Sequence, residues 1–227
     1  MIRLLQVPYS PYCIVQRHIL QCAGIKFETV EIPNGDRSLV WRLTKERYYQ
    51  VPVLQDGKTV LFETDDNSQI LAKYLDDKFH LGLFPSEWDG VQTVLWRYFE
   101  NDVESFTFKI NDTYWKQTVP KSDQLRFLRH KERKFGRGCL DQWTDQRLAL
   151  IEGLTKALVP CEQMLATRPF LLGQTPLFVD FDLFGMLGNF LYTGNEQLPP
   201  SHTRLAAWHA RMSALKLIVS KREKLRS

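Results

Sequence analysis

The first 32 residues constrain the fold most strongly, because they alternate strand, helix and strand. Ile2–Gln6 has the pattern of a short buried strand, and Phe27–Ile32 alternates like a second strand. Between them, Ser10 and Pro11 are typical of a helix start, and Gly24 stands where a glycine often ends a helix. This βαβ unit predicts two parallel strands joined by a right-handed crossover.

The following residues extend this unit into a small α/β domain. Arg37–Arg47 predicts a short second helix, and Val53–Phe62 predicts a hairpin whose Asp-Gly turn is typical of type I′. Asn67–Leu75 carries apolar residues on one side and predicts a third helix. The predicted order of elements is β-α-β-α-β-β-α.

The chain changes character after residue 79. Residues 80–90 (HLGLFPSEWDG) contain Gly, Pro and Ser without a strand pattern, which indicates a linker. Beyond it only helices are predicted, and Pro160 is expected to kink or restart one of them. The predicted helices are Val91–Trp115, Cys139–Thr167, Phe178–Tyr192 and Thr203–Lys216. We therefore expect an α/β domain over 1–79 and an all-α domain over 91–227.

Composition argues against several classes of protein. No apolar run approaches the roughly 20 residues that span a bilayer, and the N-terminus does not resemble a secretory signal. We expect a soluble cytoplasmic protein with no membrane partner. The 4 cysteines form no C-x-x-C pair, and the 5 histidines lack the spacing of metal ligands, so no metal is expected.

The net charge of +4 is concentrated in one segment, Arg126–Arg137 (RFLRHKERKFGR). A solvated helix face or loop is the favoured interpretation of this basic segment. A patch for anions or nucleic acid is the alternative. Because no aromatic ladder accompanies the charges, we expect no nucleic-acid partner. The basic segment can also help to draw an anionic ligand toward a cleft.

The turn that opens the first helix, Tyr9–Cys13 (YSPYC), carries groups suited to thiol chemistry. The Ser10 hydroxyl can donate a hydrogen bond to the thiolate of a ligand, and a helix N-terminus adds partial positive charge. A simple N-cap role for Ser10 is the alternative.

Two later motifs are suited to binding a peptide-like ligand. Pro52 enters a strand edge, which favours a cis bond after Val51 and leaves the Val51 backbone free to pair with an extended peptide. An ordinary edge-strand proline is the alternative. Asn67 and Ser68 open the third helix, where exposed N–H groups bind carboxylates, although a simple N-cap is again possible.

In this order, the three motifs resemble the glutathione transferase superfamily over essentially the whole chain. Ser10 stands where the family has a catalytic Ser, Tyr or Cys, and Val51-Pro52 stands where it has a cis proline. Asn67-Ser68 precedes Tyr74-Leu75 at the family's spacing, and so is preferred to Glu63-Thr64.

The C-terminal half adds to this resemblance. Phe170–Gly173 and Val179–Phe181 are similar to the family's F-L-x-G…A-D-x signature, although Leu177 replaces the usual capping Ser or Thr. The Ser-Pro-Tyr-Cys turn and Arg133–Gly136 (RKFG) resemble serine-type bacterial and fungal transferases related to lignin β-etherases.

The resemblance implies a thioredoxin-like N-terminal domain, an all-helical C-terminal domain, a homodimer, and glutathione as co-substrate. It implies that Ser10 is catalytic and stabilises the thiolate of glutathione, which then attacks a small electrophile. The implied glutathione-binding residues are Tyr12, Cys13, Gln50, Val51, Pro52, Asp66, Asn67 and Ser68. For the electrophile site we select Tyr98, Phe106 and Tyr114, with packing between helices as the alternative for such aromatic residues.

Two other functions stay open at this point. Cys13 could serve a cysteine-type thiol transferase or an enzyme like dehydroascorbate reductase, since cysteines at helix starts can be reactive. Its position, three residues past the family's usual nucleophile, argues against this function. Alternatively, the chain could be a non-enzymatic binding or regulatory protein that keeps the glutathione transferase fold.

Overall fold

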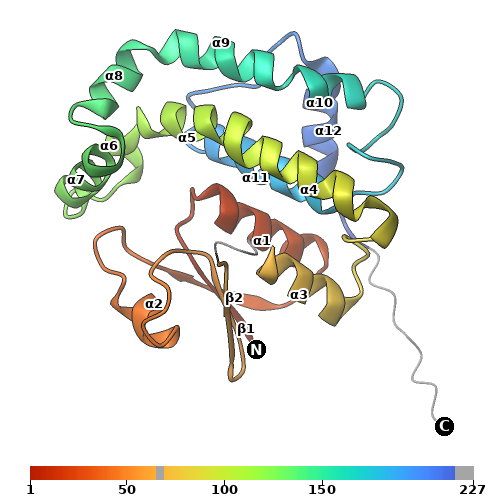
Figure 1. Cartoon of the computed structure of the whole chain (residues 1–227), viewed down its shortest axis with the longest axis horizontal. Helices are drawn as coiled ribbons and strands as arrows, with labels where there is room; N and C mark the ends of the chain where they lie inside the picture. The colour runs from red at the N-terminus through yellow and green to blue at the C-terminus, as the bar shows by residue number, and fades with distance from the viewer. Residues whose placement is uncertain (65–68, 218–227) are drawn as a thin grey trace.

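The computed structural model describes residues 1–64 and 69–217. A four-stranded sheet forms the base of the N-terminal domain, in the order β2-β1-β3-β4 (Figure 1). The strands are β1 (Ile2–Gln6), β2 (Phe27–Glu31), β3 (Val53–Asp56) and β4 (Thr59–Phe62). As predicted, β1 and β2 are parallel, with Ile2 opposite Phe27, and β3–β4 is an antiparallel hairpin. The pairing of β1 with β3 is also antiparallel.

Three helices complete the predicted β-α-β-α-β-β-α order. They are α1 (Pro11–Cys22), α2 (Ser38–Leu43) and α3 (Ile70–Phe79). The second helix is shorter than predicted, because Lys45 and Glu46 adopt left-handed backbone conformations with φ of 54° and 65°. The third continues past its predicted end at Leu75, and His80 closes it in a left-handed conformation.

The C-terminal domain is helical, as predicted, but its helices are more numerous and shorter than the pattern indicates. They are the 3₁₀-helix η1 (Ser86–Trp88), α4 (Asp89–Tyr98), the π-helix η2 (Phe99–Val103), α5 (Glu104–Asp112), α6 (Trp115–Thr118), α7 (Gln124–Phe135), α8 (Cys139–Asp145), α9 (Arg147–Ala157), α10 (Val159–Met164), α11 (Phe178–Phe190) and α12 (Thr203–Ser213). Pro160 lies in the first turn of α10, just after α9 ends, so the predicted restart is confirmed. Among the described residues, no helix has both the length and the apolar character needed to cross a membrane.

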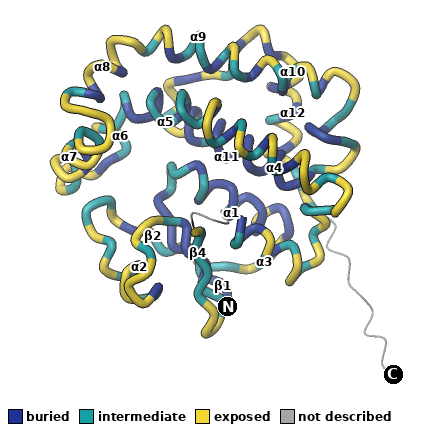
Figure 2. The backbone as a smooth tube through the Cα atoms, viewed as in Figure 1, coloured by how far each residue is buried: buried dark blue, intermediate teal, exposed yellow. Residues whose placement is uncertain are grey.

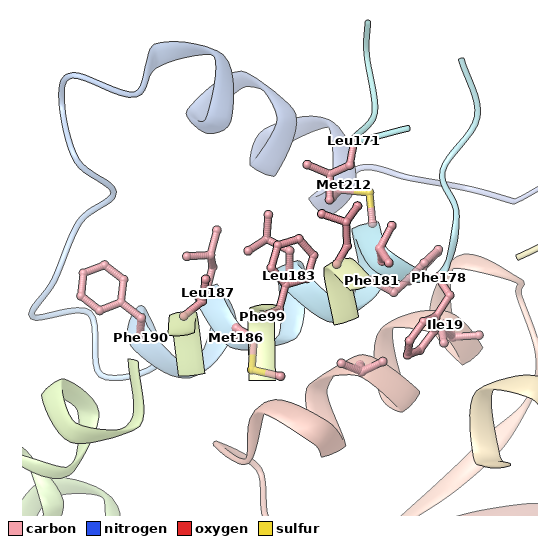
Figure 3. Packing of buried hydrophobic residues seen from close by; sticks show 14 of the residues in the cluster. Ile19, Phe99, Leu171, Phe178, Phe181, Leu183, Met186, Leu187, Phe190 and Met212 are labelled. Carbon is pink, nitrogen blue, oxygen red and sulfur yellow. The ribbon is translucent and has the colours of Figure 1, made fainter. Parts of the chain in front are cut away.

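Helix α11 joins the two domains by lying along α1 (Figure 1). It is apolar on all sides and almost entirely buried, as is the adjoining side of α1 (Figure 2). Its apolar side chains project both toward α1 and toward the helices of its own domain (Figure 3). A helix that is apolar all round is expected only where neighbours cover every face.

Two glycines of α11 allow this close approach. A Cβ atom added at Gly185 would overlap the Val15 side chain and lie 2.7 Å from the Pro11 carbonyl oxygen. A Cβ atom added at Gly188 would lie 3.1 Å from the Cγ2 atom of Ile14. The backbone of α11 therefore packs directly against the first turns of α1.

A buried aspartate holds the start of α11 in place. The Asp180 carboxylate is fully buried and accepts the N–H of Leu171 (2.9 Å), the N–H of Leu177 (3.0 Å) and the indole N–H of Trp208 (2.8 Å). The Asp180 carboxylate therefore ties the chain before α11 to the first turn of that helix. Leu177 has no side-chain acceptor, so only half of a capping box is possible here.

Gly185→Ala should destabilise the protein by about 1–3 kcal/mol, because the new methyl group meets the Pro11 backbone rather than a flexible side chain. Thermal or urea unfolding measures the change. Gly90→Ala is the matched control, since Gly90 is also helical and an added Cβ there meets nothing within 4 Å. If the two variants unfold alike, the close contact between α1 and α11 does not limit stability.

Candidate functional site

A cavity of about 950 Å³ lies between the two domains, within the usual range for small-molecule sites. The α/β domain lines it with its β1–α1 turn, its β2–α2 loop and the loop before β3: Val7, Tyr9, Ser10, Pro11, Tyr12, Asn34, Gly35, Arg37, Tyr49, Gln50 and Val51. The helical domain contributes residues of α5, α7 and α11: Glu104, Phe108, Asp112, Arg126, Phe127, Arg129, His130, Lys131, Arg133, Lys134, Phe135 and Asn189.

Ser10 stands at the N-terminus of α1 and lines this cavity. Its N–H donates to the Val7 carbonyl (3.0 Å), which fixes the turn, and Pro11 occupies the first helical position. Ser10 is the N-cap residue of α1 by position, but its side chain makes no capping hydrogen bond. Ser10 therefore lines the cavity at the positive end of a helix.

Cys13 lies three residues further along α1 and is fully buried. It is not among the lining residues of the cavity. Burial raises the pKa of the Cys13 thiol to about 11, while hydrogen bonds from Val7 and Ser10 act in the opposite direction. The structure thus does not bring Cys13 to the site, because its position on α1 faces the core.

The bond between Val51 and Pro52 is cis, as predicted. Gln50 and Val51 line the large cavity together with residues of the β1–α1 turn. Pro52 is buried behind them and lines a second, much smaller cavity. No backbone hydrogen bond of Val51 is found within the described ranges, 1–64 and 69–217.

Asp66, Asn67 and Ser68 lie outside the described residues. At the described start of α3, the N–H groups of Ile70 (2.9 Å) and Leu71 (3.2 Å) donate to the Glu63 carboxylate. The spacing to Tyr74-Leu75 favours Asn67-Ser68 over Glu63-Thr64 as the motif that opens α3. In the structure, however, the Glu63 carboxylate accepts the hydrogen bonds at the described start of this helix.

The aromatic residues selected for the electrophile site lie elsewhere. Tyr98 donates a hydrogen bond to the last carbonyl of α9 (2.6 Å), and the Phe106 ring packs over Gly153 of the same helix. Tyr114 donates to the Glu196 carboxylate (2.7 Å). None of the three lines the large cavity. The alternative interpretation, packing between helices, applies to Tyr98 and Phe106.

Helix α5 instead contributes Glu104, Phe108 and Asp112 to the cavity, at a spacing of four residues that keeps them on one side. If α4 is extended through α5 with the regular period of an α-helix, these three residues are not predicted to face the cavity. The reason is the π-helical turn Phe99–Val103, which lies between the two helices. A π-turn holds one residue more than an α-turn, which shifts the apparent phase by about 100°.

Helix α7 forms the other wall that sequence reasoning missed. It lies at one end of the helical domain, on the same side of the molecule as α2 (Figure 1). Asp123 accepts the Gly35 N–H (3.3 Å), and Arg126 donates to the Gly35 carbonyl, so the β2–α2 loop meets the start of α7. The basic segment was visible in the sequence, but only this long-range contact shows that it faces a cavity.

Beneath Tyr12, a cavity of about 20 Å³ is lined by three carboxylates, Glu63, Glu100 and Asp182. Burial raises the pKa of Glu63 and of Glu100 to about 7, and raises that of Asp182 well above its ordinary value. Within the described part of the chain, one Asp182 oxygen has no hydrogen-bond partner. Among the described residues, these three carboxylates included, no group of three or more His, Cys, Asp or Glu side chains is placed so that it could hold a metal ion.

Glu100→Gln should stabilise the protein at pH 8.5 and change its stability little at pH 5. The folded protein holds the Glu100 proton up to about pH 7, whereas an unfolded chain releases it near pH 4.5. Stability therefore falls as the pH rises through this window, because the unfolded chain ionises there while the folded protein keeps the proton, and glutamine removes that loss.

Melting temperatures at the two pH values measure this effect, and Glu87→Gln is the control because Glu87 is exposed. An equal shift of Glu100→Gln at both pH values would show that burial of this carboxyl does not oppose its ionisation.

Family models match both domains. Residues 4–81 match the N-terminal domain of glutathione S-transferase, and residues 141–211 match the C-terminal domain. A search of curated protein sequences finds no relative that matches the chain.

Solved structures share the whole fold at low sequence identity. Glutathione transferase GSTFuA3 from Phanerochaete chrysosporium has a TM-score of 0.79 and 19% identity, covering 96% of this chain and 98% of that one. CsGST63524 of Ceriporiopsis subvermispora, in complex with glutathione, has a TM-score of 0.79 and 17% identity, with the same coverage. Glutaredoxin 2 from Salmonella typhimurium, in complex with glutathione, has a TM-score of 0.74 and 19% identity, covering 94% of each chain.

These matches agree with the thioredoxin-like sheet, the helical second domain and the order of motifs along the chain. The protein belongs to the glutathione transferase superfamily.

Proposed function

We propose that this protein is a serine-type glutathione transferase, which binds glutathione in the large cavity and transfers it to a small electrophile. The observation that carries the proposal is the position of Ser10. Ser10 lines the cavity at the N-terminus of α1 and makes no capping hydrogen bond with its side chain, and Val51 lines the same cavity.

In this proposal, the cysteinyl backbone of glutathione pairs with Val51, assisted by Gln50, and its sulfur lies near Ser10. The γ-glutamyl group is assigned to Asp66, Asn67 and Ser68, which lie outside the described residues. Tyr12 stands beside Ser10 at the base of the cavity. Two of the structural neighbours are complexes with glutathione, which supports this assignment.

Ser10 would act on the thiol of glutathione rather than form a covalent intermediate. Its hydroxyl donates a hydrogen bond to the thiolate, and the helix N-terminus favours the same negative charge. The thiol proton passes to solvent. The sulfur lone pair then forms a bond to an electrophilic carbon, and the leaving group departs with its bonding electrons. The enzyme contributes thiolate stabilisation and proximity.

A mechanism through Cys13 is less well supported, because this thiol is buried and its pKa is raised to about 11. Cytoplasmic location, the homodimer and the relation to β-etherases stay predictions.

Saturating glutathione should raise the melting temperature, because a ligand that binds only the folded state stabilises it.

Ser10→Ala should reduce turnover at least tenfold while changing glutathione affinity much less, since one hydroxyl acts mainly on the sulfur. Cys13→Ser is the discriminating variant and should keep activity. If Ser10→Ala keeps full activity and Cys13→Ser abolishes it, the cysteine mechanism holds instead.

The thiol of bound glutathione should have a pKa roughly two units below that of free glutathione, equivalent to about 2.7 kcal/mol of preferential thiolate stabilisation. Ultraviolet difference spectra of the complex across pH measure the thiolate directly. A Cys13→Ser background removes the nearest protein thiol from the signal. An unshifted titration with glutathione bound would identify a binding protein rather than an enzyme.

A further inference from the structure

Helix α7 gives the large cavity a strongly cationic wall. The lining contains 6 Lys and Arg side chains: Arg37, Arg126, Arg129, Lys131, Arg133 and Lys134. Against them stand 2 carboxylates, Glu104 and Asp112. Five of the cations belong to α7, where spacings of three, four and seven residues place side chains on a common side.

One of these cations is already neutralised. Lys131 forms an ion pair with Asp112, which is buried. The Lys131 ammonium also lies over the rings of Phe108 (5.0 Å) and Phe127 (5.3 Å). Lys131 therefore contributes to the packing of the wall rather than to its excess charge.

The other cations keep their charge available. Among the residues that the structure describes, no ion pair is found for Arg37, Arg129, Arg133 or Lys134. One terminal nitrogen of Arg37 is buried and has no hydrogen-bond partner in the same part of the chain. Leaving the partly buried Arg37 donor without a partner is costly. Arg129, Arg133 and Lys134 are exposed, and their unpaired charges make the potential at this wall positive, which favours anionic groups.

Aromatic surface accompanies the charge. Phe108, Phe127 and Phe135 line the cavity together with the cations. The rings of Phe108 and Phe135 are 5.3 Å apart, and Phe135 is partly exposed. A ligand for this wall would combine a flat apolar body, which packs on the rings, with a negative group that meets the cations.

Glutathione does not account for all of this charge. Arg126 contacts the β2–α2 loop through Gly35, whereas Arg133 and Lys134 lie roughly 10 Å further along the axis of α7. A single carboxylate of glutathione cannot pair with cations at both ends of this wall. The cations near the loop can serve glutathione, while the distant pair faces the space left for the second substrate.

Building on the proposed function, we propose that the second substrate is an aromatic electrophile that carries a carboxylate or another anionic group, held by Arg133 and Lys134 over Phe108 and Phe135.

The test compares 3,5-dinitrobenzoate with 3,5-dinitrobenzamide, which share one ring and nearly one shape but differ in charge. Calorimetric titration measures both, with and without saturating S-methylglutathione. The benzoate should bind about tenfold more tightly than the amide, because charged hydrogen bonds are the stronger ones. High salt should reduce this ratio. A ratio near one in the unchanged protein would overturn the inference.

The double variant Arg133→Gln/Lys134→Gln should bring the ratio close to one and leave glutathione affinity unchanged. Its matched control is Lys121→Gln/Arg137→Gln, which removes the same charge from exposed residues that flank α7 outside the cavity lining. The control should keep the ratio. The proposed contact would be overturned if both double variants lost the preference for the benzoate equally. It would also be overturned if Arg133→Gln/Lys134→Gln lost affinity for glutathione.

A separate assay keeps the two proposals distinguishable. Turnover of glutathione with 4-chloro-3,5-dinitrobenzoate, in which sulfur replaces chloride on the ring, tests the proposed transferase function. Absent turnover with a preserved benzoate preference would reject the enzyme and retain the anion site. Suppose instead that the protein turns over this substrate but shows no preference for the anionic compound, either in binding or in kcat/KM compared with 4-chloro-3,5-dinitrobenzamide. That result would retain the enzyme and reject the anion site.

Discussion

The close packing of α1 on α11 is the contact on which the rest of the structure depends. Because Gly185 presents only backbone, the Pro11 carbonyl and the first turns of α1 settle directly on the helical domain. This contact carries Ser10 to the interdomain cavity. Asn189 of α11 reinforces it by donating a hydrogen bond to the Tyr9 carbonyl (2.8 Å). The site is therefore assembled by the domain interface and not by the α/β domain alone.

The architecture could be predicted from local patterns because its signals lie close together in the sequence. Strand alternation, the Ser10-Pro11 helix start and the Asp56-Gly57 turn each depend on neighbouring residues. The order of these signals then leaves few arrangements of the sheet. The cis bond at Pro52 was one of two interpretations that the local sequence left open, and the resemblance to glutathione transferases implied it.

The cavity walls were harder to predict, because they depend on contacts between distant residues. The basic segment looked like a solvated helix face until the hydrogen bonds between Gly35 and the start of α7 placed it against the α/β domain. Cys13 looked reactive from its place near a helix start, but α1 turns this position into the core. Tyr98 and Phe106 pack toward α9, a neighbour that no local pattern identifies.

The π-helical turn Phe99–Val103 has a consequence for comparing this chain with its relatives. Such a turn absorbs a single-residue insertion and leaves the following helix in place. A relative with an unbroken helix and one residue fewer could present the same wall to its own cavity. An alignment without a gap inside this turn would then pair Phe108 with a neighbour of its true counterpart. In this part of the family, equivalence of residues has to be assigned by superposition rather than by counting along the chain.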